Sequence, residues 1–164
     1  MARAFISVPV PSEAVAHIRR LKRTQKGIRW TDLSQWNVTL CFFERCDIEE
    51  VGKRFSQIKA NPVSAVFGPR VRVLGQNNLV IPVKGLSNLA RQVQQAIHPH
   101  NSEENQFPFV GHLTLGRLKG VTQAEIENAR IEGSFNVNEL ELVQSFLGSS
   151  APTHKTVRRL PLPS

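Results

Sequence analysis

The chain has 164 residues, of which 40% are hydrophobic and 21% are charged. This length is enough for one domain with a sizeable core, and the composition excludes an intrinsically disordered chain. The 21 Lys and Arg residues outnumber the 13 Asp and Glu residues, and the formal net charge of +8 favours polyanionic partners, nucleic acid before anionic membrane.

The sequence lacks the features of membrane and secreted proteins. Its apolar runs are shorter than the roughly 18–20 residues of a transmembrane helix, and Pro9 and Pro11 interrupt the N-terminal segment too early for a signal peptide. Cys41 and Cys46 match neither a disulfide framework nor a usual zinc motif, so we expect two buried, reduced thiols. We therefore expect a cytoplasmic protein, a monomer, with no membrane partner.

In the first half of the chain, apolar runs predict strands over 3–10, 28–30 and 38–43. Two helices are predicted by helical spacing of apolar residues. The first helix has Ser12 as its N-cap and carries an apolar stripe of Val15, Ile18 and Leu21. The second has Asp47 as its cap and carries Ile48, Val51, Phe55 and Ile58.

The second half is predicted to contain further strands and two more helices. Strands are expected over 63–67, 70–74 and 79–83, with a hairpin turn at 75–78 between the last two, and later over 109–119, 135–146 and 155–160. One helix, capped by Ser87, extends to Ile97, and a short one covers 122–130. The polar segment 99–108 is expected to be an exposed loop. Helices between antiparallel strands, with no linker to divide them, indicate one α+β domain.

A short phrase that ends in Thr-Leu occurs twice, over residues 37–40 and 112–115. Since alternate residues of a strand share a face, Asn37 and Thr39 should lie on one face, and so should His112 and Thr114. Polar pairs of this kind are costly inside a core. They are expected to line a wet cleft between two similar lobes, while the intervening apolar residues point into the core.

His112 is the best acid–base candidate in the chain, because histidine alone has an ordinary pKa near neutrality. The Thr114 hydroxyl and the Arg117 guanidinium, on the same predicted strand, suit the oxygens of a phosphate. A lone histidine on a strand is more often structural than catalytic. The second Thr-bearing copy and the basic charge favour the functional interpretation.

These residues resemble the 2H phosphoesterase superfamily, in particular its bacterial and archaeal RNA 2′,3′-cyclic phosphodiesterases, also called 2′-5′ RNA ligases (LigT-like). The similarity covers nearly the whole chain. It includes the opening strand 3–8, Arg29 and Trp30, Trp36, and the segment 108–117 that surrounds the second phrase. It implies a bilobed, pseudo-two-fold α+β fold, in which two antiparallel sheets surround a central groove and helices lie outside. It also implies one domain of two intertwined lobes over 1–164, with no metal or organic cofactor.

The resemblance implies a mechanism as well. One family histidine activates water against the cyclic phosphodiester, the other protonates the departing ribose 3′ oxygen, and the product is a 2′-phosphate. On this sequence, His112 would be the base, and Thr39 and Thr114 would hold the non-bridging phosphate oxygens. Arg117 would support them. The expected partner is RNA with a 2′,3′-cyclic phosphate or 2′-phosphate end.

The first copy departs from the family pattern, because Asn37 stands where the family has its other histidine. An amide donates a hydrogen bond but transfers no proton near neutral pH. Losing one acid–base partner should cost about 10²–10⁴-fold in rate. Cys41 and Glu44 also depart from the family's usual residues. Three explanations of Asn37 stay open: an engineered inactivating substitution, a natural divergence that leaves weak activity, and a binding-only relative.

Three rival functions remain open at this point: a non-catalytic RNA-end binding module, a 2′-5′ RNA ligase that uses the same groove, and a basic scaffold without an active groove. The other histidines are expected outside the groove. His17 and His98 with His100 are expected on the surface, and a groove role for His154 is the less favoured alternative. Trp30 and Phe109, which flank the motifs, are expected to pack in the core.

Overall fold

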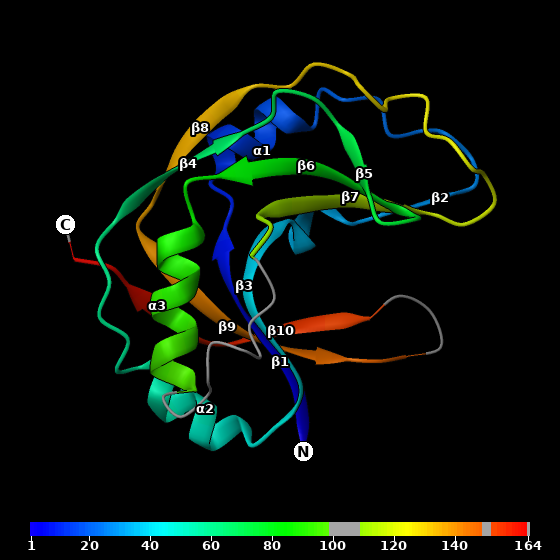
Figure 1. Ribbon diagram of the computed structural model, residues 1–164. Helices are drawn as coiled ribbons and strands as arrows, with labels where there is room; N and C mark the ends of the chain where they lie inside the picture. Colours follow the sequence, from blue (N-terminus) through cyan, green and yellow to red (C-terminus); the bar gives the residue numbers. More distant parts are fainter. Residues whose placement is uncertain (99–108, 149–151, 164) are drawn as a thin grey trace.

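A computed structural model describes residues 1–98, 109–148 and 152–163. The strands of this part form one curled, ten-stranded antiparallel sheet with three helices around it (Figure 1). The strands are β1 (Ala2–Pro9), β2 (Ile28–Trp30), β3 (Asn37–Cys46), β4 (Val63–Phe67), β5 (Arg72–Leu74), β6 (Asn78–Lys84), β7 (His112–Leu118), β8 (Gly133–Val137), β9 (Glu139–Phe146) and β10 (Thr153–Pro161). The helices are α1 (Ser12–Ile18), α2 (Ile48–Phe55) and α3 (Ser87–Ile97), and η1 (Leu33–Gln35) is a single 3₁₀ turn.

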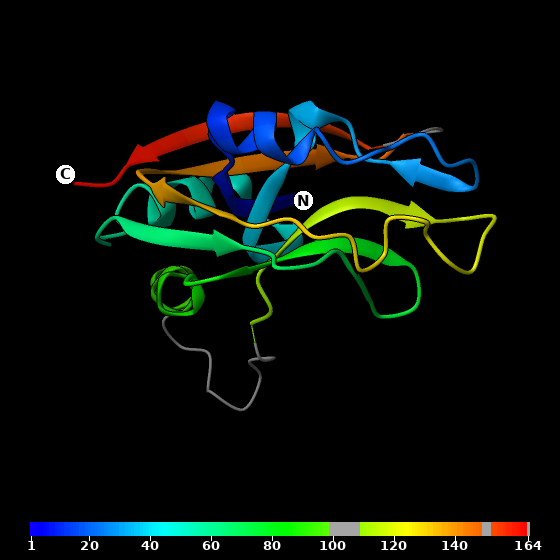
Figure 2. The same ribbon diagram turned by 90° about the horizontal axis from the view of Figure 1, so that it is seen from above.

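The sheet consists of two halves that meet between β3 and β7. One half runs β10-β9-β1-β3, and the other runs β7-β6-β4-β8, with β2 added to β7 and β5 to β6. A single register pair, Val38 with Leu113, joins the halves. Figure 2 shows the halves as two layers, one above the other. The chain passes between them repeatedly, because β2 pairs with the second half although it precedes β3.

Alternation along β3 and β7 follows the sequence prediction. Val38 and Leu40 on β3 are 0% and 2% exposed, and Leu113 on β7 is 2% exposed, so one face of each strand belongs to the core. The residues between them are only half-buried, because they face the opposite side. These are Asn37, Thr39, His112 and Thr114. The predicted separation of polar and apolar faces is confirmed.

Of the N-caps predicted for α1, α2 and α3, only the cap of α2 is present in the structure. Asp47 caps α2, because its carboxylate accepts hydrogen bonds from the Glu49 and Glu50 backbone N–H groups at 3.1 and 3.4 Å. The caps predicted at Ser12 and Ser87 are wrong: each serine is the first helical residue, after Pro11 and Leu86, which provide no side-chain cap. None of the helices in the described ranges is both long and apolar enough to cross a membrane.

Two predicted elements in the second half are wrong. The segment 135–146 is two strands separated at Asn138, because β8 pairs with β4 while β9 pairs with β1 and β10 in the other half. The helix predicted over 122–130 is a series of turns. There the Asn128 N–H donates to the Val71 carbonyl and the Val71 N–H donates to the Ala129 carbonyl, at 2.8 and 2.9 Å, so long-range bonds replace helical ones. The loop predicted over 99–108 lies outside the described residues.

Candidate active site

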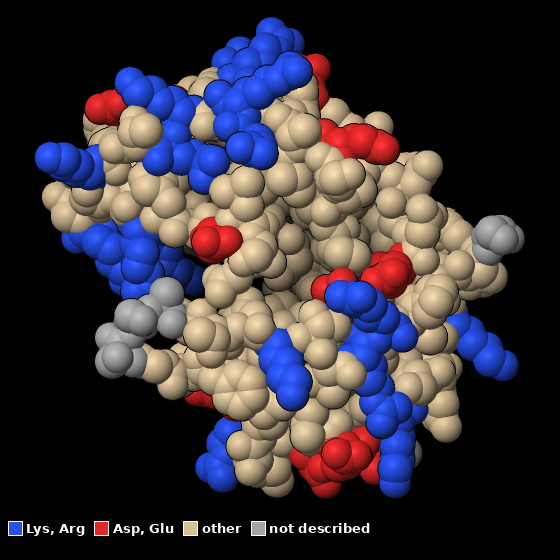
Figure 3. Space-filling model, turned by 180° about the vertical axis from the view of Figure 1, so that it is seen from behind, with Lys and Arg blue, Asp and Glu red and all other residues tan. Residues whose placement is uncertain are grey.

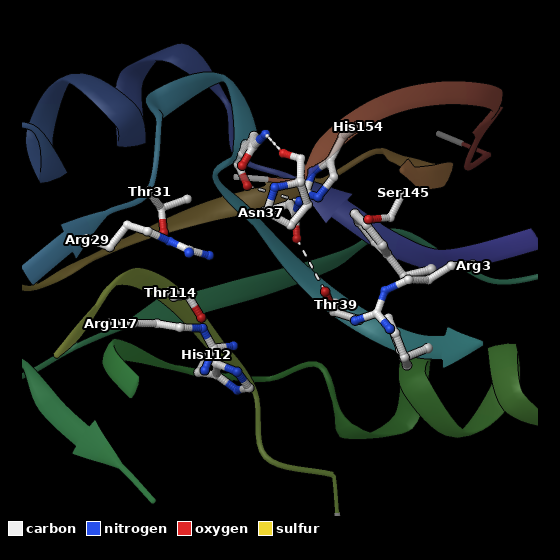
Figure 4. A pocket seen from close by; sticks show the side chains of 14 residues that line it. Arg3, Arg29, Thr31, Asn37, Thr39, His112, Thr114, Arg117, Ser145 and His154 are labelled. Atoms are coloured by element: carbon white, nitrogen blue, oxygen red, sulfur yellow. Dashed lines mark hydrogen bonds between the residues drawn. The ribbon is translucent and has the colours of Figure 1, made fainter. Parts of the chain in front are cut away.

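A cavity of about 270 Å³ opens where the two halves of the sheet face each other. Asn37 and Thr39 reach it from β3, and His112 and Thr114 reach it from β7 (Figure 4). Arg117, the remaining predicted site residue, lines the same cavity. The structure therefore brings together all five predicted site residues, and their roles remain predictions. The other residues that line the cavity are Arg3, Phe5, Arg29, Thr31, Gln35, Phe42, Ser145, Pro152 and His154.

The register between β3 and β7 explains this convergence. Val38 pairs with Leu113, and these are the second residues of the two phrases. In an antiparallel pair, the neighbours on each side then face one another across the strands. Asn37 is therefore set across from Thr114, and Thr39 across from His112. The pairing of β3 with β7 is sufficient to bring the polar residues of both phrases to one place.

His112 is held in one tautomer by a backbone carbonyl. Its Nδ1 lies 2.7 Å from the Val110 carbonyl oxygen. A carbonyl oxygen only accepts, so in the neutral ring Nδ1 carries the hydrogen and Nε2 carries the lone pair. The ring faces the cavity (Figure 4). His112 thus presents a proton acceptor to a molecule bound there.

Asn37 makes the same kind of hydrogen bond to the backbone as His112 does, but it has no basic nitrogen to correspond to the Nε2 of His112. Its Nδ2 donates to the carbonyl of Gln35, two residues earlier, at 3.1 Å, as His112 Nδ1 does to Val110. The Asn37 Oδ1 accepts a long hydrogen bond, 3.4 Å, from the Thr39 hydroxyl. Asn37 therefore reproduces the Nδ1–H of a histidine and has nothing in place of its Nε2. The site keeps the support for a histidine at this position without the histidine.

Three arginines give the cavity its charge. Arg29 and Arg117 are paired across β2 and β7, and Arg3 enters from β1, where its guanidinium lies 4.7 Å above the Phe42 ring. The ion pairs of the described residues involve none of these three side chains. Elsewhere, on the face that Figure 3 shows, Lys and Arg occur in several groups with Asp and Glu between them. The cavity therefore combines three arginines that have no ion-pair partner in the described part of the chain with a histidine and two threonine hydroxyls.

The structure corrects the prediction for His154. The favoured expectation set it outside the groove, but it lines the cavity from β10. This placement depends on long-range pairing, because His154 pairs with Ser145 on β9, which pairs with Arg3 on β1. A pattern of consecutive residues in the sequence cannot indicate which residues are paired across three strands. Arg3 and Arg29 were also missed as site residues, although both stand in the segments that carry the resemblance.

The remaining predicted residues lie away from the cavity. His17 packs against Phe67 with ring centroids 5.9 Å apart, and His98 packs against Phe43 at 5.4 Å, while His100 lies outside the described residues. The described part of the chain contains no group of three or more metal-ligating side chains. Trp30 and Phe109 pack against the core, as predicted.

Both cysteines are buried and free, as predicted. Burial raises the pKa of the Cys41 thiol to about 12, and burial likewise raises the pKa of Cys46. Both side chains are therefore neutral thiols at physiological pH.

Several solved structures share the fold of this chain over nearly its whole length. A solved structure of E. coli LigT complexed with 3′-AMP is 20% identical, with a TM-score of 0.77 over 99% of this chain and 99% of that chain. The TT0787 protein of Thermus thermophilus is 19% identical, with a TM-score of 0.78 over 98% of this chain and 97% of that chain. This chain has the LigT-like fold. No protein-family model and no curated protein matches it.

The similarity confirms the LigT-like α+β fold that the resemblance implied, and the two antiparallel sheets expected there are joined between β3 and β7 into one curled sheet. The PDE domain of MHV ns2 shares the fold more distantly, at 13% identity and a TM-score of 0.55, over 87% of this chain and 99% of that chain. Identities this low establish the fold alone. The chemistry must be argued from the cavity itself.

Proposed function

We propose that this protein hydrolyses 2′,3′-cyclic phosphate ends of RNA to 2′-phosphates, without a metal ion. The observation that supports this most is the meeting of Thr39, Thr114 and His112 in one cavity with three arginines that form no ion pair with any described residue. Hydroxyls and guanidinium groups suit phosphate oxygens, and a histidine with a free acceptor suits the activation of water. E. coli LigT, whose fold this chain shares, has been crystallised with phosphate and with 3′-AMP.

Binding would rely on the two threonines and the arginines. The Thr114 hydroxyl would donate to one non-bridging oxygen of the cyclic phosphate, and the Thr39 hydroxyl would donate to the other in exchange for its long bond to Asn37. Arg29 and Arg117 stand side by side on β2 and β7 and would balance its negative charge. Holding the phosphate at these points would present the phosphorus to a water beside His112, so that attack is in line with the departing oxygen.

The reaction needs two proton transfers. His112 Nε2 would take a proton from the attacking water as the new oxygen–phosphorus bond forms. The bond from phosphorus to the ribose 3′ oxygen then breaks, and that oxygen needs a proton. Asn37 has none to give, so if no other side chain supplies this proton the reaction should be about 10²–10⁴-fold slower than with a histidine there.

Turnover of adenosine 2′,3′-cyclic phosphate by the natural chain, Asn37→His and His112→Ala tests the proposal. Asn37→His should raise the rate, because the new ring can keep the bond to the Gln35 carbonyl through Nδ1 and present Nε2 to the substrate. His112→Ala should abolish turnover. If Asn37→His gains nothing and His112→Ala loses nothing, the proposed reaction is wrong.

A non-catalytic RNA-end binding module is the second candidate, and Asn37 itself favours it. Both ends of the Asn37 amide are engaged, by Gln35 and Thr39, so the residue is suited to a fixed cavity wall. This function predicts tight binding of a 2′-phosphate end and no turnover even after Asn37→His. A 2′-5′ RNA ligase would use the same groups in reverse, and adding an oligonucleotide with a 5′-hydroxyl to the assay would reveal the joined product.

A further inference from the structure

A second histidine stands at the same cavity as His112. His154 lies in the row that Arg3, Ser145 and His154 form across β1, β9 and β10, and all three side chains line the cavity. In Figure 4, His154 lies on the Asn37 side of the cavity, and His112 lies on the opposite side with Thr114 and Arg117. The cavity therefore has imidazoles on two of its walls.

Hydrogen bonds tie the His154 segment to the Asn37 segment. Gln35 Nε2 donates to the Pro152 carbonyl at 3.0 Å, and Asn37 Nδ2 donates to the Gln35 carbonyl at 3.1 Å. Gln35 thus connects the residue two positions before His154 with Asn37. Asn37 and His154 also line an adjoining cavity together. The two side chains thus share both cavities, although their strands are not adjacent in the sheet.

The His154 ring is oriented by packing. Its edge meets the Phe5 ring, with centroids 5.1 Å apart and an interplanar angle of 72°. None of the other side chains that line the cavity forms a hydrogen bond with it (Figure 4). Its nitrogens therefore have no competing partner among these side chains when a substrate is bound.

We propose that His154 is the general acid of the reaction and takes the place of the histidine missing at position 37. This inference rests on the proposed function. His112 Nε2 takes one proton from the water whose oxygen bonds to phosphorus, and the bond to the 3′ oxygen breaks. Protonated His154 gives its proton to that oxygen. The products are a 2′-phosphate and a 3′-hydroxyl, and exchange with solvent restores both rings.

The pH dependence should reflect this role. Although the residue as a whole is exposed, burial of its ring against Phe5 lowers the pKa of His154 below its ordinary value. An acid acts in its protonated form, so kcat should fall as pH rises through that pKa. The charged or titratable side chains that line the two cavities together with His154 are Arg3, Arg29, His112, Arg117, Glu141 and Arg159. The falling limb of the pH profile is assigned to His154 if it is lost in a His154 variant.

The test compares His154 variants in two backgrounds, the natural chain and Asn37→His. In the natural chain, His154→Gln and His154→Phe should lower kcat by about 10²-fold, change KM little and remove the falling limb. Phe keeps the contact with Phe5. In the Asn37→His background the same changes should cost less than about threefold, because the new histidine supplies the proton. Lys155→Gln, the next residue on β10 and absent from the cavity lining, is the matched control and should keep natural turnover.

The other possible results with the His154 variants would overturn either the role of His154 or the proposed function. Equal losses in both backgrounds would show that His154 only positions or binds, and no loss in either would show that it takes no part. Either result overturns the inference while His112-dependent turnover upholds the proposed function. Absence of turnover in every variant, Asn37→His included, overturns the proposed function and the inference together. Thermal unfolding of each variant identifies any loss caused by misfolding.

Discussion

Strands β3 and β7 carry similar phrases in the same geometry, and of the phrase residues that face the cavity only the first differs, Asn37 on β3 and His112 on β7. In both, the leucine and the residue before Thr are buried, and the threonine faces the cavity. In both, the first residue donates from its side chain to the carbonyl two residues earlier. Only His112 adds a second nitrogen toward the cavity. The comparison teaches that both strands keep the same backbone support for a first side chain and that β3 lacks the histidine; in the proposed mechanism, His154 on β10 makes the missing proton transfer.

Among the proposed phosphate-binding side chains, substitution of Thr39 and Thr114 should have the largest kinetic effect, and it tests whether the two strands contribute equally to phosphate binding. Thr39→Val and Thr114→Val keep the shape of the side chain and remove its hydroxyl. If both hydroxyls hold the phosphate, each change should remove about 1.5–3 kcal/mol of transition-state stabilisation, or roughly 10–100-fold in kcat/KM. Steady-state kinetics on adenosine 2′,3′-cyclic phosphate measure this. An effect at Thr114 and none at Thr39 would break the equivalence of the strands.

The residue that follows each phrase offers a structural test, because it is Cys41 on β3 and Gly116 on β7. A Cβ at Gly116 would lie 2.9 Å from the Arg29 carbonyl oxygen, so β2 passes too close to β7 for a side chain. Gly116→Ala should destabilise the protein by about 1–3 kcal/mol in chemical denaturation. Gly148→Ala is the control, because an added Cβ there meets no atom of the described residues within 4 Å beyond its chain neighbours. Equal stability of the two variants would show that the approach of β2 is unimportant.

Substitution of Arg29 on β2 or Arg117 on β7 should have the smallest effect on kinetics. Arg29→Gln and Arg117→Gln should each raise KM by about 3–10-fold at low salt, and less at high salt, because exposed charges are screened. Both residues are exposed and directly opposite each other. Arg130→Gln, whose partner is Glu132 and which does not line the cavity, is the control. A loss that is independent of salt would contradict a role limited to charge.

The parts of the site that the sequence predicted depend on local geometry. Alternation along a strand is a property of consecutive residues, so the faces of Asn37, Thr39, His112 and Thr114 could be inferred directly. The repeated phrase indicated that the two strands meet. The α2 cap at Asp47 was predictable for the same reason, since capping involves only the next three residues.

The parts that could not be predicted depend on contacts between distant segments. His154 reaches the cavity because β10 pairs with β9, and Gln35 bonds to Pro152 from far along the chain. The segment 122–130 has a helical pattern, but Val71 takes up its backbone hydrogen bonds at Asn128 and Ala129. Competition of this kind between local and distant partners is invisible in a single sequence.

The central claim is that this cavity opens a 2′,3′-cyclic phosphate on its 3′ side. The most direct measurement is ³¹P NMR of adenosine 2′,3′-cyclic phosphate incubated with the natural chain and, in parallel, with His112→Ala. We expect adenosine 2′-phosphate as the sole product, slowly formed by the natural chain and not by the variant. Adenosine 3′-phosphate as the product, or equal turnover by His112→Ala, would contradict the account.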